Sequence, residues 1–253
     1  MAKLLKEFPY LYETHMHTEE ASRCGKVSGA EMARAAKEYG YSGVFITDHH
    51  WGGNTRPDRE LPWEEWVDEF CSGYEAAKRV GDEIGLSVFM GWEAGFCGTE
   101  FLIYGLDKAW MKAHPELRTV SVEEQYQLIR EAGGMVIQAH PFREEPYIPE
   151  IRLFPEWVDG VEIINAQHSN PGGNRPHPEY DRKAREYAAK YGLPGTAGSD
   201  MHRAELLGGG VAFKEKLNSV QDFIRKIKSG KGYVITDGVR WYNPQGDLLG
   251  EEN

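Results

Sequence analysis

The sequence has few of the features that mark secreted, membrane-spanning or nucleic-acid-binding proteins. Its 253 residues include three cysteines, Cys24, Cys71 and Cys97, and this small odd number argues against a disulfide framework. No apolar run approaches the roughly 20 residues that a membrane-spanning helix needs, and the first residues lack the apolar core of a secretory signal. We therefore expect a cytoplasmic protein with no membrane partner.

Positive charge is also scarce. The chain has 29 Lys and Arg residues against 40 Asp and Glu, and its formal net charge is −11. Contacts to a phosphate backbone need clustered Lys and Arg, so we expect no nucleic acid polymer as a partner. A small phosphate substrate is not excluded, because bound metals would add positive charge locally. The sequence leaves the oligomeric state open.

Short β-rich runs alternate with longer amphipathic stretches along the chain. Strands are expected at residues 11–17, 43–47, 86–92, 101–104, 135–137, 161–164, 195–198 and 233–236, and helices at 28–39, 62–83, 121–132, 179–191 and 220–228. Ser28 with Glu31, and Ser121 with Glu124, have the spacing of a capping box at a helix start.

This alternation predicts parallel βαβ units in an α/β fold. The number of units favours closure into a barrel, with an open doubly wound sheet as the alternative. We expect a single domain over residues 1–253, with 240–253 as a C-terminal tail. The stretch 168–178, rich in Asn, Gly and Pro, is expected to be a long loop beside the active site.

Histidine and acidic residues recur at the ends of the expected strands. His15 and His17 lie two apart on the first strand, so their imidazoles face the same side and suit the chelation of one metal. The later strands bring Asp48, His49, Glu93, Glu100, His140, Asp200 and His202. Functional residues of α/β folds gather at the C-terminal ends of strands, so the ordered series predicts a metal site. Each residue alone also has a structural explanation, such as Asp200 capping a helix.

The motifs in this series resemble those of the PHP family, named after polymerase and histidinol phosphatase. They are His15-Met16-His17-Thr18, Thr47-Asp48-His49, Gly91-Trp92-Glu93, Ala139-His140-Pro141 and Ser199-Asp200-Met201-His202. The resemblance implies a distorted, TIM-like (β/α)7 barrel. It also implies two or three divalent metals, for which zinc, manganese and iron all occur in the family.

The resemblance further implies a ligand for each metal. His15, His17, Glu93 and Asp200 would hold the first metal, Glu93 would bridge to a second that His140 also binds, and His49 and His202 would hold a third. The chain departs from the family at two positions. Glu100 stands where a histidine is common and is the expected substitute, while Cys24 aligns with a His or Asp and is either a ligand of the third metal or a bystander.

The leading hypothesis is a metal-dependent phosphoric ester hydrolase that uses a metal-activated hydroxide to release phosphate from a small organic phosphate. His202 is the candidate acid for the leaving group, with His50 and His177 as weaker ones. Arg143 would clamp the phosphate, or would pair with Glu144 or Glu145 at the rim. The other candidate substrate contacts are Asn165, His168, His177, Arg23 and Arg175.

Two other hypotheses stay open. The same metals would serve an amidohydrolase-like enzyme that cleaves a carboxylic ester, lactone or amide. A non-catalytic PHP module is the third reading, although the nearly complete ligand set argues for retained chemistry. The specific substrate is not encoded in any pattern that we recognise.

Overall fold

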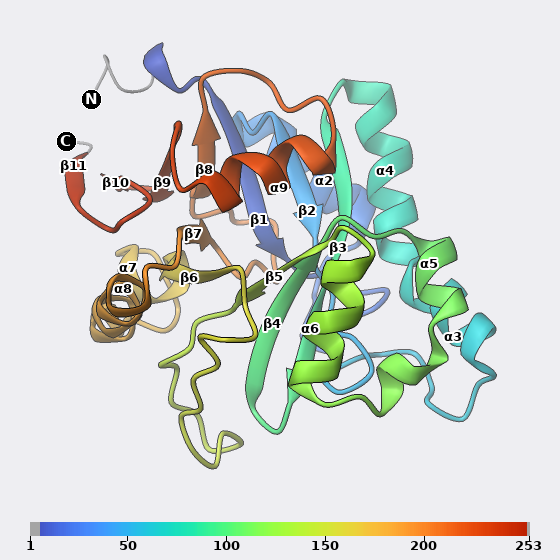
Figure 1. Cartoon of the computed structure of the whole chain (residues 1–253). Coiled ribbons are helices and arrows are strands. Elements are labelled where there is room, and N and C mark those ends of the chain that lie inside the picture. Colours follow the sequence, from blue (N-terminus) through green and yellow to red (C-terminus); the bar gives the residue numbers. More distant parts are fainter. Residues whose placement is uncertain (1–5, 252–253) are drawn as a thin grey trace.

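Eleven strands form one mixed β-sheet in the part of the chain that the computed structural model describes, residues 6–251 (Figure 1). They are β1 (Tyr10–Met16), β2 (Gly43–Ile46), β3 (Ser87–Phe96), β4 (Thr99–Tyr104), β5 (Met135–Gln138), β6 (Gly160–Asn165), β7 (Gly195–Gly198), β8 (Gly209–Phe213), β9 (Tyr233–Asp237), β10 (Arg240–Tyr242) and β11 (Leu248–Glu251). Their order in the sheet is β11-β10-β9-β8-β1-β2-β3-β4-β5-β6-β7.

The strands run in both directions. Parallel pairs join β1 to β2, β2 to β3, β5 to β6 and β6 to β7. The β3–β4 and β4–β5 pairs are antiparallel, and so are the pairs that join β1 to β8 and continue to β11. Helices connect the parallel pairs β1–β2, β2–β3 and β6–β7, whereas a loop without a helix joins β5 to the parallel strand β6.

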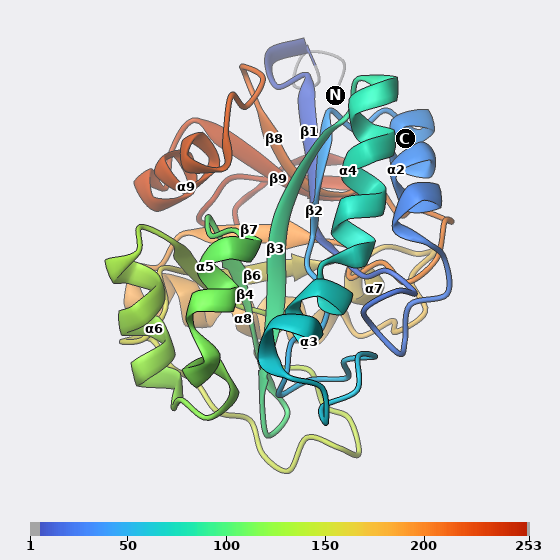
Figure 2. The same ribbon diagram turned by 90° about the vertical axis from the view of Figure 1, so that its right-hand side faces the viewer.

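Helices pack on the outside of the sheet (Figures 1 and 2). They are α2 (Gly29–Tyr39), α3 (Trp63–Phe70), α4 (Ser72–Ile84), α5 (Lys108–Ala113), the 3₁₀ turn η1 (Pro115–Arg118), α6 (Val122–Glu131), α7 (Ala166–Ser169), α8 (Pro178–Tyr191) and α9 (Val220–Ser229). Figure 2 shows α2 and α4 side by side against the blue and green strands. At residues 6–251 no helix is long and apolar enough to cross a membrane.

The sheet is curled, because strands far apart in its order share one core. Tyr12 of β1, Ile163 of β6 and Tyr233 of β9 belong to a single buried apolar cluster, which α9 also enters through Phe223. Backbone hydrogen bonds hold the segment after β7 against β1: the His17 N–H donates to the Met201 carbonyl at 2.8 Å. The C-terminal ends of β1 and β7 therefore lie next to each other.

The mixed α/β fold that we predicted is confirmed, but the complete seven-unit barrel is not. Among the described strands β7 forms a ladder with β6 only, and the other edge of β1 is taken by the antiparallel strand β8. The sheet therefore forms a curled half-barrel. The described part of the expected tail, residues 240–251, contains β10 and β11 and extends the sheet.

The expected long helix at residues 62–83 is two helices, α3 and α4, that meet at Cys71. The Ser72 hydroxyl donates back to the Glu69 carbonyl at 2.6 Å. After this junction Gly73 packs so tightly on Thr18 that a Cβ atom would lie 2.0 Å from the threonine hydroxyl. The break thus lets α4 approach the segment that follows β1.

The strands β3 and β4 form a tight hairpin, which the sequence analysis did not predict. Phe96 pairs with Thr99, and the two turn residues Cys97 and Gly98 have positive φ angles of 48° and 85°. Such angles are typical of the two-residue turns that suit twisted hairpins. Glu100 faces Gly95 across the hairpin, so it lies diagonally from Glu93 on the same face of the sheet.

The buried carboxylate of Glu13 holds the curled sheet closed. One of its oxygens, Oε1, accepts hydrogen bonds from the backbone N–H groups of His15 and Ser199, both at 2.9 Å. Its other oxygen accepts from the Tyr41 hydroxyl at 3.3 Å. Since Ser199 follows β7, one side chain joins the two ends of the curl, and burial raises its pKa to about 7.

We expect Glu13→Ala to lower the free energy of unfolding by about 3 kcal/mol, because it leaves two buried N–H groups without an acceptor. Glu13→Gln keeps an acceptor and should cost much less.

The raised pKa of Glu13 means that its contribution to stability is fully present below about pH 4.5 and is lost as the pH rises to about 7. Urea unfolding of chelator-treated protein at pH 5 and pH 8 measures both effects. If the wild type lost no more stability between pH 5 and pH 8 than Glu13→Gln does, this role of Glu13 would be contradicted.

Candidate metal centre

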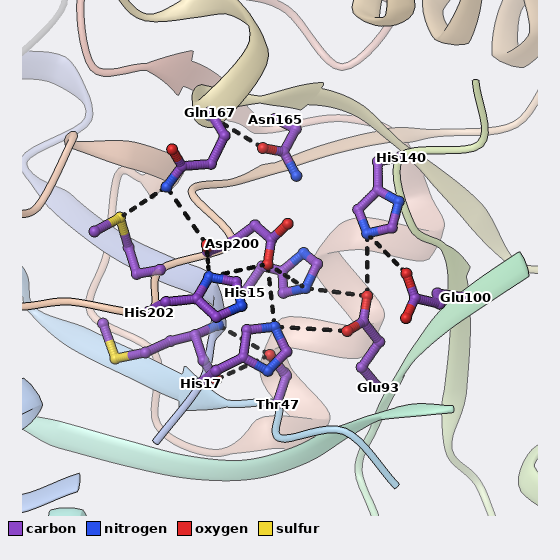
Figure 3. Close-up of polar contacts among 12 residues, drawn as sticks. His15, His17, Thr47, Glu93, Glu100, His140, Asn165, Gln167, Asp200 and His202 are labelled. Carbon is purple, nitrogen blue, oxygen red and sulfur yellow. Dashed lines mark hydrogen bonds and ion pairs between the residues drawn. The ribbon is translucent and has the colours of Figure 1, made fainter. Parts of the chain in front are cut away.

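The C-terminal end of β1 brings two fully buried imidazoles, those of His15 and His17, to the inner face of the curled sheet. Figure 3 shows them beside Asp200 and Glu93. His17 Nε2 lies 3.1 Å from Asp200 Oδ1, and His15 Nε2 lies 3.2 Å from Glu93 Oε1. These four side chains come from β1, β3 and the segment after β7, so the curl of the sheet is what assembles them.

A second group shares Glu93 with the first. His140 Nε2 lies 3.1 Å from Glu93 Oε1 and 3.6 Å from Glu100 Oε2. His49 Nδ1 lies 2.9 Å from Glu93 Oε2 and 3.6 Å from Glu100 Oε1. Glu93 therefore lies between the two groups, and the β3–β4 hairpin places Glu100 where it faces both histidines.

Cys24 lies in a third group, with His17, His49 and His202, whose potential ligand atoms all lie within 4.8 Å of one another. Burial alone would raise the pKa of the Cys24 thiol, but hydrogen bonds with His202 and His49 lower it to about 6. A thiolate beside imidazoles is a ligand set that zinc and iron favour. The structure thus brings together every residue that we predicted as a ligand.

The residues in these groups fit divalent ions better than they fit one another. His15 Nε2, His49 Nδ1 and Glu93 Oε2 are buried but have no hydrogen-bond partner in residues 6–251, although each lies within 3.5 Å of an oppositely charged atom. These atoms lie within 4.8 Å of other potential ligand atoms, so they converge without forming hydrogen bonds to one another. Buried polar atoms are normally paired, so their convergence marks a place for a cation.

The charges of the site support the same conclusion. Although burial opposes ionisation, His15 and His49 lower the pKa of Glu93 well below its usual value. Burial likewise opposes protonation of His15, but Glu162, Glu93 and Asp200 raise its pKa well above the ordinary value. In the metal-free protein, protons on histidine thus balance the carboxylates, and metal binding would displace them.

Backbone strain occurs at two of the predicted ligands. His140 and Asp200 have positive φ angles of 26° and 49°, which non-glycine residues rarely adopt. Both sit where a strand gives way to a loop. Such conformations are costly and tend to occur at functional sites, where the surrounding structure holds them.

A layer of hydrogen bonds behind the ligands fixes their orientation. Glu162 Oε1 contacts His15 Nδ1 at 2.8 Å, and its Oε2 accepts from the His140 backbone N–H at 3.1 Å. Asp48 accepts from the Ser22 hydroxyl at 2.7 Å, and Ser22 lies 3.3 Å from His17 Nδ1. When one ring nitrogen of a histidine donates its proton to a carboxylate, the other nitrogen keeps a lone pair that can bind a metal. Asp48 is therefore part of this supporting layer and is not in a ligand group.

An open cavity of about 450 Å³ lies over the ligand groups and is lined by Cys24, His49, Glu100, Asp200 and His202. Arg143 also lines it, although its side chain is only 4% exposed. Its guanidinium donates through one terminal nitrogen to Asp200 and through Nε to His168 Nε2 at 3.3 Å. It does not pair with Glu144 or Glu145, the rim alternative that we considered.

Several other predicted residues lie away from this cavity. Asn165 is fully buried and donates to Glu162, while its side-chain oxygen caps α7. His168 is buried between Arg143 and Asp181. The exposed Arg23 donates to the Thr55 carbonyl, and His177 stacks on Tyr180. None of the four lines the cavity, and the contacts that the structure shows for them are with other parts of the protein.

His50 is also no proton donor to a substrate. It lies beneath the site among Trp63, Trp66, Phe70 and Trp92. Burial lowers its pKa to about 3, so it stays neutral at neutral pH.

Sequence reasoning missed three functional-looking residues. Glu162 was placed in its strand, but its position behind His15 depends on the pairing of β6 with β7, which no local pattern encodes. Tyr147 lines the cavity. Asp181, on α8, accepts from His168 Nδ1 at 3.0 Å, and its only sequence signal was an acid in the first turn of a helix.

Comparisons with known proteins confirm the resemblance to the PHP family. The model of the PHP-associated family matches residues 178–231. An uncharacterised protein of Methanocaldococcus jannaschii, MJ1587, is 28% identical over 137 residues, which cover 54% of this chain and 66% of that protein. The chain thus spans just under two thirds of this relative.

Solved structures share the fold at low sequence identity. A two-domain protein from Bacteroides vulgatus, which contains a predicted PHP-like metal-dependent phosphoesterase, has a TM-score of 0.65 at 14% identity, with 90% of this chain and 64% of that chain covered. An amidohydrolase from Chromobacterium violaceum, with sulfate bound, has a TM-score of 0.51 at 16% identity over 76% of this chain and 87% of that one. At such identities the likeness establishes the fold.

A further structural neighbour corrects our expectation about nucleic acids. Endonuclease Q, in complex with a 27-mer duplex substrate that has an abasic lesion at the active site, has a TM-score of 0.56 at 12% identity, over 88% of this chain and 57% of that chain. A protein that shares this fold therefore binds a DNA duplex, and excluding a nucleic acid partner from net charge was wrong. The count treated every carboxylate as surface charge, whereas Glu93, Glu100 and Asp200 are buried in the ligand groups.

We expect Glu162→Gln to weaken metal binding by about 10- to 100-fold, because the amide is a poorer acceptor for His15 Nδ1. Titration of chelator-treated protein with Zn²⁺ or Mn²⁺ under a competing chelator measures the affinity. Glu144→Gln, at an exposed position in the loop after β5, is the matched control. Equal affinities in the two variants would show that Glu162 does not support a metal ligand.

The lowered pKa of Cys24 predicts a reactive thiolate in metal-free protein. Iodoacetamide should modify Cys24 with a pH midpoint near 6, and stoichiometric Zn²⁺ should protect it. Cys71, which is buried and has its pKa raised to about 12, should stay unmodified. Peptide mapping by mass spectrometry separates the three cysteines. A midpoint near 9 for Cys24, or no protection by zinc, would exclude it from the third group.

Proposed function

We propose that this protein is a metal-dependent hydrolase that releases phosphate from a phosphate ester. The observation that carries the proposal is the buried guanidinium of Arg143, which lines the same cavity as the three ligand groups. Metal-dependent hydrolysis of esters and amides alike would need the ligand groups. A guanidinium fixed beside them has a specific use for a phosphoryl group, whose oxygens it can bind in pairs.

The proposed ligand sets follow the three groups. His15, His17, Glu93 and Asp200 would hold one ion, and Glu93, Glu100 and His140 would hold a second. Cys24, His49 and His202 would hold a third. Bound divalent ions would supply a water of lowered pKa and would neutralise charge on the phosphoryl oxygens. Zinc, manganese and iron all match these donors, and Cys24 favours zinc or iron at the third position.

His202 fits the role of a ligand better than that of a general acid. Its Nδ1–H donates to the Asp200 backbone carbonyl at 2.7 Å, so the neutral ring has its lone pair on Nε2. His202 also shares a hydrogen bond with Cys24 and belongs to the same ligand group. A general acid would need a proton on the free nitrogen, and metal binding there would exclude it.

Arg143 would bind and orient the phosphoryl group. Two of its N–H groups are engaged, with Asp200 and His168, and an arginine has five such donors. The remaining ones have no partner in residues 6–251 and are available to the cavity. Because Asp200 is itself in the first ligand group, Arg143 holds an ester oxygen close to where the first ion would sit.

Metal-loaded protein should hydrolyse p-nitrophenyl phosphate, and Arg143→Ala should lower kcat/KM by about 10²- to 10³-fold, as expected for the loss of a positioned donor to the transition state. Arg143→Lys should recover part of the rate, since it restores the charge without the fork. Arg225→Ala, at an exposed position paired with Asp222, is the control. Metal content must be measured alongside, because Arg143 also contacts Asp200.

A matched ester separates this proposal from the amidohydrolase alternative. Hydrolysis of p-nitrophenyl acetate without hydrolysis of p-nitrophenyl phosphate would favour a carboxylic ester, lactone or amide substrate. Undiminished phosphatase activity in metal-replete Arg143→Ala would remove the observation on which the proposal rests. A purified protein that takes up no metal on reconstitution would point to a non-catalytic module.

A further inference from the structure

A second, smaller cavity adjoins the one over the ligand groups. Its volume is about 190 Å³, and Cys24, Arg175, Asp200 and His202 line both cavities. The residues that line only the second cavity are Lys26, Gln167, Asn174 and Arg203. A ligand bound at the metal centre can therefore extend past His202 into this space.

The second cavity is positively charged, in contrast to the chain as a whole. Lys26, Arg175 and Arg203 border it, while the net charge of the protein is −11. Its one carboxylate, Asp200, is paired with Arg143 and lies 3.1 Å from His17 Nε2 of the first ligand group. Three cations around a small space are unfavourable unless an anion shares it.

Two of the three cations have no acid close by. Among residues 6–251, neither Lys26 nor Arg203 has a carboxylate within 4.0 Å, whereas Arg175 pairs with Glu145 at 3.5 Å. Other exposed lysines, such as Lys112 and Lys214, form ion pairs, whereas Lys231 in the described residues does not. What sets Lys26 and Arg203 apart is that both lack an ion pair and border one cavity.

Backbone contacts fix these groups relative to the metal centre. The Lys26 N–H donates to the His202 carbonyl at 2.9 Å, so the two strand-end segments that contribute to the third ligand group also bring Lys26 and Arg203 together. On the opposite side, Gln167 Oε1 accepts from the Asn174 N–H at 3.1 Å, and the Arg175 N–H donates to the Gln167 carbonyl at 3.1 Å. The loop between α7 and α8 is thus held in place as one wall.

We propose that this second cavity is a subsite for a second phosphate group, carried by the same substrate beyond the scissile phosphate. A phosphate dianion suits the site because two guanidinium groups and an ammonium can share its oxygens. The inference rests on the proposed phosphoesterase function. It narrows the substrate class to phosphate esters with another phosphate nearby, either a small bisphosphate or the 5′-phosphorylated end of an oligonucleotide.

Matched substrates test the subsite in the metal-loaded protein. Fructose 1,6-bisphosphate is compared with fructose 6-phosphate, and the 5′-phosphorylated dithymidine pdTpdT with thymidine 5′-monophosphate. We expect kcat/KM to be at least 10-fold higher for the member with the second phosphate in one pair, and that pair identifies the source. Turnover of monophosphates with a ratio near 1 in both pairs would overturn the subsite but leave the phosphoesterase proposal standing.

Charge variants show whether the named cations cause the preference. Lys26→Glu and Arg203→Ala should each lower the ratio within the preferred pair toward 1. Lys231→Glu, which makes the same charge change in the exposed turn before β9, should leave the ratio as in the wild type. An equal loss of the ratio in Lys231→Glu would mean that general electrostatic attraction, and not the cavity, selects the second phosphate.

A binding measurement keeps the inference testable even if no ester is hydrolysed. Equilibrium dialysis of metal-loaded protein with radiolabelled inorganic phosphate should detect two sites per chain. Arg143→Ala should weaken one of them, and Lys26→Glu combined with Arg203→Ala should weaken the other. A single phosphate site that the double variant leaves intact would overturn the subsite.

Discussion

Glu93 places one carboxylate between His15, His49 and His140, all of them buried, and the rest of the centre depends on that placement. An ionised carboxylate out of water needs close countercharge. Protons on histidine can provide it, but the unpartnered ring nitrogens and the strained backbones at His140 and Asp200 suit divalent ions better. The curl of the sheet makes this arrangement possible, since only by bringing the end of β7 back to β1 does Asp200 reach His17.

The clustering of the histidines and carboxylates could be predicted from sequence because most of them stand at or just after a strand end, where local order suffices to place them. The two departures from the family were harder. Glu100 depends on the β3–β4 hairpin, whose Cys97-Gly98 turn lacks the Asn-Gly or Asp-Gly signal that usually reveals such a turn. The supporting role of Glu162 was not predicted, because its contact with His15 spans more than a hundred residues and leaves no local trace. Asp181 contacts His168 from the next helix, and no motif in the sequence marked that pair. For the same reason β8 was not predicted, because its place between β9 and β1 exists only in the folded sheet.

The charge count shows how composition misleads about partners. It weighs Glu93, Glu100, Glu162 and Asp200 as negative surface, yet all four are buried, and ions bound among them would reverse the local field. A substrate would meet the guanidinium of Arg143 and the cations at the mouth, because the field near a cavity depends on the charges that border it. Interactions between exposed charges are screened beyond about 10 Å at ordinary ionic strength. The charges that border the cavity therefore predict its partners better than the net charge of the chain.

The buried series Asp181, His168, Arg143 and Asp200 explains how one guanidinium keeps its charge inside the protein. Arginine only donates, so His168 Nε2 must accept from Arg143 Nε, and the ring proton must then sit on Nδ1, where Asp181 accepts it. Burial lowers the pKa of His168 to about 3, which keeps the ring neutral. A carboxylate in place of His168 would orient Arg143 equally well but would cancel its charge. With a neutral imidazole on one side and Asp200 on the other, Arg143 is fixed in direction while one carboxylate, itself shared with the first ligand group, is its sole close counterion among the described residues.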